Sequence, residues 1–245
     1  IVDLAHRRKF AQFFTPEQIA LFMSNWVLEG LSSDADVLEP AIGLGMFSRT
    51  MCRMKPNLNI VGYDIDKTIF SYALSNFGAA HYKISLSNED YLMASWTQKY
   101  DAIICNPPYL KFHDYDNATL IPLVNKKLQT HLNGFTNIYT LFLLKSLSQL
   151  KEYGKLAYII PSEFLNSDYG VEVKRELLKS GTLRHVIIVD FNQCVFDDAL
   201  TTACVLLCQN TKTSNEVTFS TVKNMEDLSS FMRNSVSYNL KELDP

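Results

Sequence analysis

Apolar residues along the chain switch between helical spacing and short continuous runs. The first helical stretch, TPEQIALFMSNWVLEG, covers residues 15–30. Its apolar positions, three or four residues apart, are Ile19, Phe22, Met23, Trp26 and Val27. This spacing predicts a helix with one buried face. We expect Thr15 to be its N-cap, with Pro16 at the first helical position and Gln18 completing a capping box.

The rest of the chain alternates between runs typical of strands and segments typical of helices. Strands are predicted over 36–40, 59–65, 81–87, 100–105, 155–161, 183–191 and 201–210. Helices are predicted from the turn after 40 to about 55, and over 66–78, 137–154 and 169–181. This order predicts an α/β fold of the Rossmann type, a mostly parallel seven-stranded sheet with helices on both faces. The last two strands are joined without a helix, which predicts an antiparallel hairpin at the sheet edge.

Two segments show no clear pattern. Residues 110–136 form a long polar connection, which we expect to be structureless and mobile. After Asn210 the sequence becomes a polar tail. We therefore assign 1–210 to a catalytic domain, and 211–245 to a tail or to the beginning of a further region.

Composition bounds the possible functions. The 245 residues are 47% hydrophobic and carry a formal net charge of -3, so the chain can bury a large core and has no overall basic footprint for nucleic acid. The five cysteines include no CxxC pair, so we expect neither a metal site nor disulfides, but instead reduced thiols in a cytoplasm. We see no signal peptide and no membrane-spanning run. Because the chain begins at Ile1 rather than Met, we expect a fragment or a trimmed sequence.

A glycine turn follows the first predicted strand, in VLEPAIGLGMF. Gly43 and Gly45 allow a tight turn and a close approach to a ligand, but Ser48 stands where the dinucleotide fingerprint has its third glycine. Asp64 at the end of the second strand suits ribose hydroxyls, and Asp90 after the third suits an adenine amino group. With Glu39 beside the turn, these acids favour a nucleoside with a cationic tail, S-adenosylmethionine, over a dinucleotide. A turn without a ligand is the structural alternative.

The strongest signal is CNPPY, residues 105–109, at the end of the fourth strand. Each proline holds the preceding residue extended, so the Asn106 side-chain oxygen and the Pro107 carbonyl can point at one spot. Two fixed acceptors suit a planar amino group and favour a localised lone pair on its nitrogen. Tyr109 would stack on the ring that carries the amine. The alternative is a strand that ends in a Pro-Pro turn.

These motifs resemble the gamma-class, TaqI-like adenine-N6 DNA methyltransferases of restriction–modification systems, from about Phe10 to Cys208. The resemblance implies S-adenosylmethionine as cofactor and a flipped adenine of duplex DNA as substrate. It makes Asn106, Pro107, Pro108 and Tyr109 the catalytic motif. FAQFFTP resembles the N-terminal cofactor motif and implies cofactor contacts for Phe14, Thr15 and Pro16. The other implied cofactor residues are Glu39, Pro40, Ala41, Gly43, Gly45, Phe47, Asp64, Ile65, Asp90 and Phe142.

VFDDALTTACVLL resembles the hairpin whose aromatic residue faces the flipped base, here Phe196. An ordinary core phenylalanine is the alternative. A slot between Tyr109 and Phe196 would recover, by stacking, part of the free energy spent on flipping. Lysines in the 110–136 connection would touch the DNA backbone, although a solvated insertion is equally open.

The family usually carries a target-recognition region after the hairpin, and 35 residues are too few for it. We therefore expect a missing C-terminal domain or a separate specificity subunit as partner, supplying most of the phosphate contacts. Alternative substrates are an RNA adenine, a cytosine N4 amine and a protein glutamine amide. A third possibility is a catalytically idle binding subunit.

Overall fold

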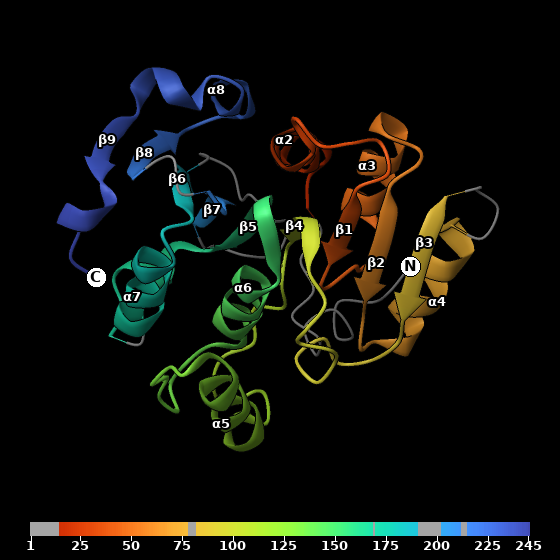
Figure 1. Cartoon of the computed structure of the whole chain (residues 1–245), viewed down its shortest axis with the longest axis horizontal. Coiled ribbons are helices and arrows are strands. Elements are labelled where there is room, and N and C mark those ends of the chain that lie inside the picture. The colour runs from red at the N-terminus through yellow and green to blue at the C-terminus, as the bar shows by residue number, and fades with distance from the viewer. Residues whose placement is uncertain (1–14, 78–81, 169, 191–201, 212–214) are drawn as a thin grey trace.

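A computed structural model describes residues 15–77, 82–168, 170–190, 202–211 and 215–245. Within these ranges nine strands form one sheet in the order β3-β2-β1-β4-β5-β7-β6-β8-β9 (Figure 1). The strands are β1 Asp36–Glu39, β2 Asn59–Tyr63, β3 Lys83–Ser87, β4 Tyr100–Cys105, β5 Leu150–Pro161, β6 Leu183–Val189, β7 Ala203–Gln209, β8 Glu216–Val222 and β9 Val236–Asn239.

The sheet is mostly parallel, as predicted. Strands β3, β2, β1, β4 and β5 pair in parallel, and β6 pairs in parallel with β8. Strand β7 runs antiparallel between β5 and β6, which confirms the predicted hairpin. The seven predicted strands are all present, and β8 and β9 extend the sheet beyond them. Strand β8 was not predicted because Thr218 and Ser220 interrupt its apolar pattern, although both are buried.

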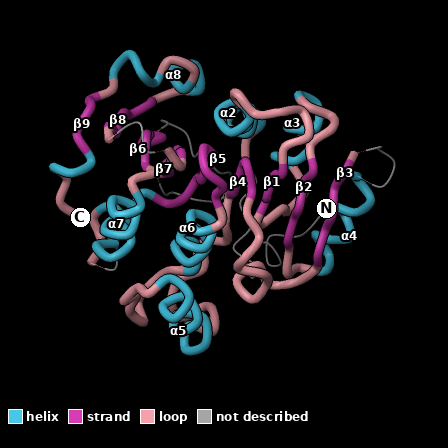
Figure 2. The backbone as a smooth tube through the Cα atoms, in the orientation of Figure 1, coloured by secondary structure: helices cyan, strands magenta, loops and turns pink. Residues whose placement is uncertain are grey.

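Helices cover both faces of the sheet (Figure 2). They are α2 Glu17–Leu28, α3 Met46–Met54, α4 Lys67–Phe77, α5 Asn117–Leu128, α6 Ile138–Ser148, α7 Gly170–Ser180 and α8 Met225–Leu228, with the 3-10 turns η1 Ser162–Leu165, η2 Phe231–Asn234 and η3 Leu240–Glu242. Helices α2 and α3 pack on one face, and α6 and α7 pack on the other, with α5 outside α6.

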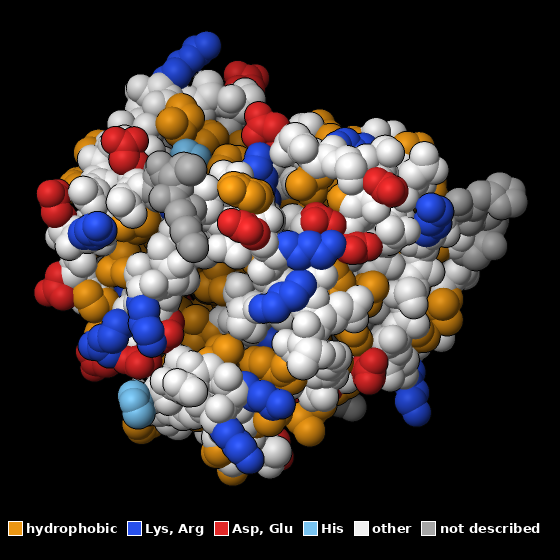
Figure 3. All heavy atoms as spheres, in the orientation of Figure 1, with side chains coloured by type: hydrophobic (Ala, Val, Ile, Leu, Met, Phe, Trp, Pro, Cys, Tyr) orange, Lys and Arg blue, Asp and Glu red, His pale blue; other side chains and the backbone are white. Residues whose placement is uncertain are grey.

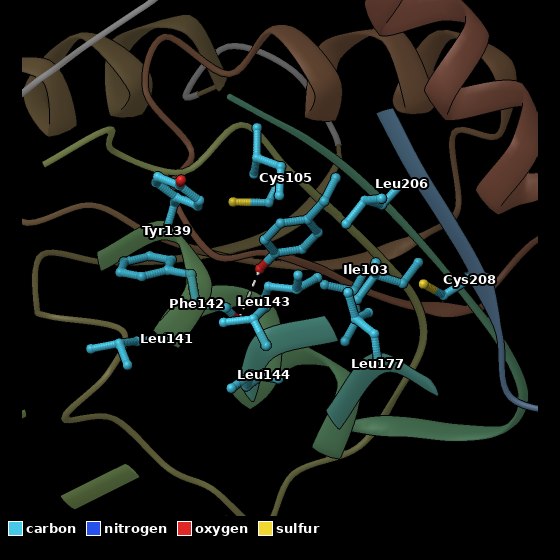
Figure 4. Close-up of a cluster of buried hydrophobic side chains, with 14 of the residues drawn as sticks. Ile103, Cys105, Tyr139, Leu141, Phe142, Leu143, Leu144, Leu177, Leu206 and Cys208 are labelled. Atoms are coloured by element: carbon cyan, nitrogen blue, oxygen red, sulfur yellow. Dashed lines mark hydrogen bonds between the residues drawn. The ribbon is translucent and has the colours of Figure 1, made fainter. Parts of the chain in front are cut away.

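Alternating side chains of the central strands build two cores. On β4, Ala102 and Ile104 face α2 and α3, whereas Ile103 and Cys105 face α6. Figure 4 shows this second core, where side chains of β4 and β7 meet those of α6 and α7. Because successive strand residues point to opposite faces, a continuous apolar run on β4 fills both cores. The NPPY motif that follows β4 is therefore anchored in the middle of the molecule.

The predicted capping box at the first helix is wrong. Helix α2 begins at Glu17 with Pro16 at its N-cap position, and no side chain caps it. The Thr15 hydroxyl instead accepts a hydrogen bond from Asn106. A tertiary partner has replaced the local one that the sequence pattern predicts.

The helix predicted over 137–154 is also too long. Helix α6 ends at Ser148, and β5 begins at Leu150. Gly154 therefore lies inside a strand, where an added Cβ would stand 3.0–3.2 Å from three backbone oxygens. Its role is to allow close packing against β4, and it does not end a helix.

The 110–136 connection contains a helix, contrary to the expectation that it is structureless. Helix α5 begins after Asp116, whose carboxylate accepts a hydrogen bond from the Thr119 N–H. Leu120, Ile121 and Val124 are buried against α6. Pro122 obscured the helix in the sequence, because proline inside a helix removes a hydrogen bond.

None of the helices in the described part of the chain is long and apolar enough to cross a membrane. The face in Figure 3 carries acidic and basic side chains interspersed with one another. This mixture agrees with the nearly balanced charge of the sequence.

Candidate active site and cofactor cavity

A cavity of about 640 Å³ opens at the carboxyl ends of the parallel strands, around the ends of β1, β2 and β4. The chain passes from β1 outward to β2 and β3, then returns to β4 on the other side of β1. Ligands of open α/β sheets bind at such a switch point, because the turns on either side diverge there. The cavity therefore lies where the fold alone would place a site.

The glycine turn after β1 forms one wall. Gly43 and Gly45 both have positive φ angles, 55° and 76°, which side-chain-bearing residues rarely adopt. At Gly45 an added Cβ would also stand 2.6 Å from the Phe77 ring. Gly43 lines the cavity, whereas Gly45 does not line it and lies against the Phe77 ring.

Glu39 at the end of β1 is almost fully buried in the same wall. Its Oε2 accepts hydrogen bonds from the Ser48 N–H, at 3.0 Å, and from the Ser48 hydroxyl. Burial nevertheless raises the pKa of Glu39 to about 8, and these two bonds offset only part of the rise. Ser48 stands where a dinucleotide motif has its third glycine, and here it holds the Glu39 carboxyl group in place.

Asp64 directly follows β2 and binds the glycine turn that follows β1. Its Oδ2 accepts a hydrogen bond from the Gly43 N–H and its Oδ1 accepts one from the Asp66 N–H, both at 2.9 Å. Burial raises the pKa of Asp64 to about 6. The carboxylate lines the cavity, and it also fixes the glycine turn against β2.

Asp90, Tyr91 and Phe142 form the wall around the turn after β3. Asp90 Oδ1 accepts a hydrogen bond from the Leu92 N–H at 2.8 Å, and burial raises its pKa. The rings of Tyr91 and Phe142 lie 5.2 Å apart. Ile65, 61% exposed, adds an apolar side chain to the lining. A carboxylate with apolar surfaces nearby suits an adenine, which has an amino edge and two apolar faces.

The NPPY motif follows β4 directly. Asn106, Pro107 and Pro108 line the cavity. The Asn106 Nδ2 donates a hydrogen bond to Thr15 Oγ1, 3.1 Å away and 91 residues distant in sequence. The segment before α2 and the NPPY motif therefore meet in one place.

Tyr109 does not line this cavity. Its hydroxyl donates a hydrogen bond to the Ile159 carbonyl at 3.2 Å, and its ring meets the Tyr139 ring edge-on at 6.2 Å. The contacts fix the ring at the end of β5. Its stacking on a base stays a prediction.

Most of the predicted site residues lie around one cavity. The predicted residues that line the cavity are Thr15, Glu39, Pro40, Ala41, Gly43, Phe47, Asp64, Ile65, Asp90, Asn106, Pro107, Pro108 and Phe142. Pro16, Gly45 and Tyr109 do not line it, and Phe14 and Phe196 lie outside the described residues. The individual roles of all these residues stay predictions.

Part of the wall was missed from the sequence. Leu110, Asp114, Tyr115, Asp116, Thr119 and Leu120 line the cavity from the α5 connection, which we expected to be structureless. Tyr115 is held there by its hydroxyl, which donates to the Thr136 carbonyl at 2.6 Å. The Asp-x-x-Thr cap at 116–119 was the available signal for this helix.

The described lining is strongly acidic. It carries six carboxylates against one guanidinium, that of Arg49. The six are Glu39, Asp64, Glu89, Asp90, Asp114 and Asp116. Such a wall favours a ligand with positive charge, with Arg49 available for a carboxylate group of that ligand. Over the described ranges, no three His, Cys, Asp or Glu side chains group closely enough to hold a metal ion.

Comparison with known proteins identifies the family of this chain. The sequence model of the Eco57I restriction-modification methylase matches residues 49–196, more than half of the chain. The chain belongs to the Eco57I restriction-modification methylase family. The match spans the NPPY motif, the α5 connection and most of the cavity wall.

Relatives with high coverage agree with this family. Type II methyltransferase M.AccI of Acinetobacter calcoaceticus is 48% identical over 254 residues, which cover 100% of this methylase chain and 47% of the relative. This methylase chain therefore spans about half the length of that relative.

Solved structures share the fold. A methyltransferase subunit of a type I restriction-modification system from Streptococcus thermophilus superposes with a TM-score of 0.79 at 18% identity, over 94% of this chain and 56% of that one. A Listeria monocytogenes protein assigned to the class I S-adenosylmethionine-dependent methyltransferases gives a TM-score of 0.74 at 17% identity, over 95% and 71%. The fold of this methylase is therefore the class I S-adenosylmethionine-dependent methyltransferase fold.

S-adenosylmethionine is the cofactor, and the cavity suits it. The cofactor carries an adenine, a ribose and a methionine tail with a positively charged sulfur. Asp64 and Asp90 offer acceptors at the ends of β2 and β3, and the acidic wall suits the cationic tail. Residues at both ends of the cavity are thus complementary to the chemistry of the cofactor.

Proposed function

We propose that this chain is the catalytic part of a DNA methyltransferase that methylates the N6 amino group of adenine. The observation that carries the proposal is the position of Asn106 and Pro107 in the wall of the cofactor cavity, at the carboxyl end of β4. Membership of a restriction-modification methylase family favours DNA over RNA or protein as the substrate. M.AccI, by its name a Type II methyltransferase, supports the same choice.

The proposed role of the motif is to bind the amino group in a reactive state. The Asn106 Oδ1 and the Pro107 carbonyl each accept one hydrogen of the adenine amine, which favours a pyramidal nitrogen with a localised lone pair. When bound, the cofactor supplies a methyl group on sulfur, and the carbon–sulfur bond breaks with its electron pair kept by sulfur as the nitrogen–carbon bond forms. The methylated nitrogen is acidic and releases its proton, so the motif needs no strong base.

An adenine inside a duplex cannot reach this motif, since its amino group lies in the base stack. We propose that the base is flipped out of the helix at a cost of a few kcal/mol. Tyr109, the last residue of the motif, and Phe196 are the proposed stacking partners. Sequence-specific binding would come from a target-recognition region or a separate specificity subunit, since net charge -3 gives the chain little attraction to phosphates.

Nucleoside analysis tests the base that is methylated. Genomic DNA from a methylation-deficient bacterial host expressing the protein should contain N6-methyladenine by mass spectrometry. N4-methylcytosine in its place would overturn the adenine assignment, and methylated RNA with unmodified DNA would overturn the choice of substrate.

An amide substitution tests the role of the motif. Asn106→Ala should reduce methyl transfer by at least roughly a hundredfold, because loss of one positioned hydrogen-bonding group from an oxyanion hole costs about 10²–10³ in rate. Its calorimetric affinity for S-adenosylmethionine should stay within about twofold of wild type. Asn76→Ala, on the exposed side of α4, is the matched control and should have wild-type activity. Normal turnover in Asn106→Ala would contradict the role of the amide.

A further inference from the structure

Thr15 lies where the sequence predicts a helix-capping residue, but its hydroxyl bonds to Asn106 instead. Helix α2 has Pro16 at its N-cap position, and no side chain caps it. Thr15 is only 7% exposed and lines the cavity beside Asn106. Its Oγ1 accepts the hydrogen bond from Asn106 Nδ2 at 3.1 Å. The bond joins the segment before α2 to the end of β4.

The direction of this bond decides which end of the Asn106 amide faces Thr15. A carboxamide accepts hydrogen bonds at its oxygen and donates them at its nitrogen. With the nitrogen turned toward Thr15, the oxygen is directed away from Thr15. A flipped amide would present N–H groups to a substrate amine, so two donors would face each other. Only the observed orientation lets Asn106 accept from an amine while its own nitrogen keeps a partner.

The bond also acts on the oxygen through the amide itself. Donation from Nδ2 polarises the carboxamide and makes its oxygen a better acceptor, because linked hydrogen bonds strengthen one another. Giving up this partly buried hydrogen bond costs free energy, so the hydroxyl also disfavours other rotations of the side chain. Orientation and acceptor strength would both fall if the hydroxyl were removed.

We propose that Thr15 is a positioning residue for methyl transfer, whose hydroxyl holds the Asn106 amide with its oxygen presented to the target amine. This inference rests on the proposed function, and it gives Thr15 a role in the chemical step beyond the cofactor contact that its motif implies. A hydroxyl at position 15 is therefore required for turnover more than for cofactor affinity.

Paired substitutions at position 15 test the proposal. Thr15→Val keeps the shape and removes the hydroxyl, and Thr15→Ser keeps the hydroxyl. We expect Thr15→Val to lower kcat roughly tenfold, the effect of one hydrogen bond, while its calorimetric Kd for S-adenosylmethionine stays within about twofold of wild type. Thr15→Ser should return kcat to within about threefold of wild type. A raised Kd with unchanged kcat would show that Thr15 serves the cofactor alone, and would overturn the proposal.

A matched control comes from the opposite end of the sheet. Thr182 is also buried, and its hydroxyl bonds to that of Ser180 just before β6. Thr182→Val makes the same chemical change far from the cavity and should leave kcat and Kd unchanged. A tenfold loss of kcat in Thr182→Val as well would show that the effect at position 15 is general destabilisation.

The side-chain amide of Asn106 gives a readout that needs no turnover. In wild-type protein labelled with ¹⁵N, the Asn106 side-chain NH₂ signals, assigned by their loss in Asn106→Ala, should exchange slowly with solvent. Thr15→Val should shift them and accelerate their exchange, and Thr15→Ser should restore them. Unchanged signals in Thr15→Val together with full activity would overturn the inference. An inactive wild-type protein with slow amide exchange would instead count against the proposed function.

Discussion

Glu39 shows how burial changes the chemistry of a single residue in the cavity wall. Its carboxyl group has an ordinary pKa of 4.5, and burial raises the pKa to about 8 in the folded protein. Between these values the folded protein holds a proton that the unfolded chain has released. Raising the pH from 4.5 to 8 therefore favours unfolding, and the stabilisation from this group is fully present only below pH 4.5. The same wall binds a cationic ligand best once Glu39 is ionised.

Substituting Glu39 isolates this effect. The melting temperature of wild type should fall between pH 5 and pH 8 by several degrees more than that of Glu39→Gln, measured by scanning calorimetry at fixed ionic strength. Asp64, whose pKa is also raised, remains in both proteins, so its contribution cancels in the comparison. Parallel melting curves across this pH range would contradict the burial of an uncompensated carboxyl.

Thr15 makes a related point about single residues. Its neighbours in sequence predict that Thr15 caps a helix. In the folded chain its hydroxyl instead accepts a hydrogen bond from the Asn106 side chain. Local patterns identify polar residues that need a partner. Which partner they receive depends on segments far away in the sequence.

At the scale of elements, helix α6 organises the turn after β3. Lys145 of α6 is fully buried, and its ammonium donates hydrogen bonds to the carbonyls of Tyr91 and Ala94. It lies 4.2 Å from the Tyr91 ring centre and 4.7 Å from that of Trp96. Burial lowers the pKa of Lys145 to about 7, with the nearby Asp90 carboxylate acting in the opposite direction. The lysine thus holds the turn that carries Asp90 into the cavity wall.

Removing this cation should loosen the cofactor site. Lys145→Met keeps the side-chain volume but removes the ammonium bonds to both carbonyls, so we expect a threefold to tenfold weaker calorimetric affinity for S-adenosylmethionine, on the order of one hydrogen bond. Lys174→Met is the matched control. Lys174 donates a hydrogen bond to the Leu165 carbonyl at 3.0 Å, and neither residue lines the cavity. Equal affinities of the two variants would refute the role of Lys145.

Helix α5 shows where element prediction failed. Pro122 and the polar residues around it concealed a helix whose apolar face packs on α6 and whose preceding loop lines the cavity. The stabilisation comes from burial of Leu120, Ile121 and Val124, a tertiary effect absent from the local pattern.

Across the whole molecule, the two cores on either side of the sheet hold the site in place. Leu143 of α6 is fully buried among side chains of the second core, as Figure 4 shows. Leu74 of α4 is 48% exposed. The same substitution at the two positions therefore measures burial directly.

Leu143→Ala should lower the free energy of unfolding by about 2–5 kcal/mol, because it removes a buried side chain and leaves a cavity. Leu74→Ala should change it by less than about 1 kcal/mol. Urea unfolding followed by circular dichroism measures both values. Similar losses at the two positions would be inconsistent with the described packing.

Local sequence patterns alone specify the alternation of strands and helices, the glycine turn and the NPPY motif at the end of β4. These features are local, since strand and helix periods, positive φ angles and X-Pro restrictions act over a few residues. Together with the family resemblance, they were enough to predict the class of fold, the cofactor and 13 of the 28 described residues that line the cavity.

Only the tertiary structure decided which distant groups meet. It placed Thr15 against Asn106, brought the α5 connection into the cavity wall, buried Lys145 beneath the Asp90 turn and added β8 and β9 to the sheet. Each of these contacts joins segments from separate parts of the chain. Their free energy comes from burial and from pairing polar groups in the folded core, which no local pattern records.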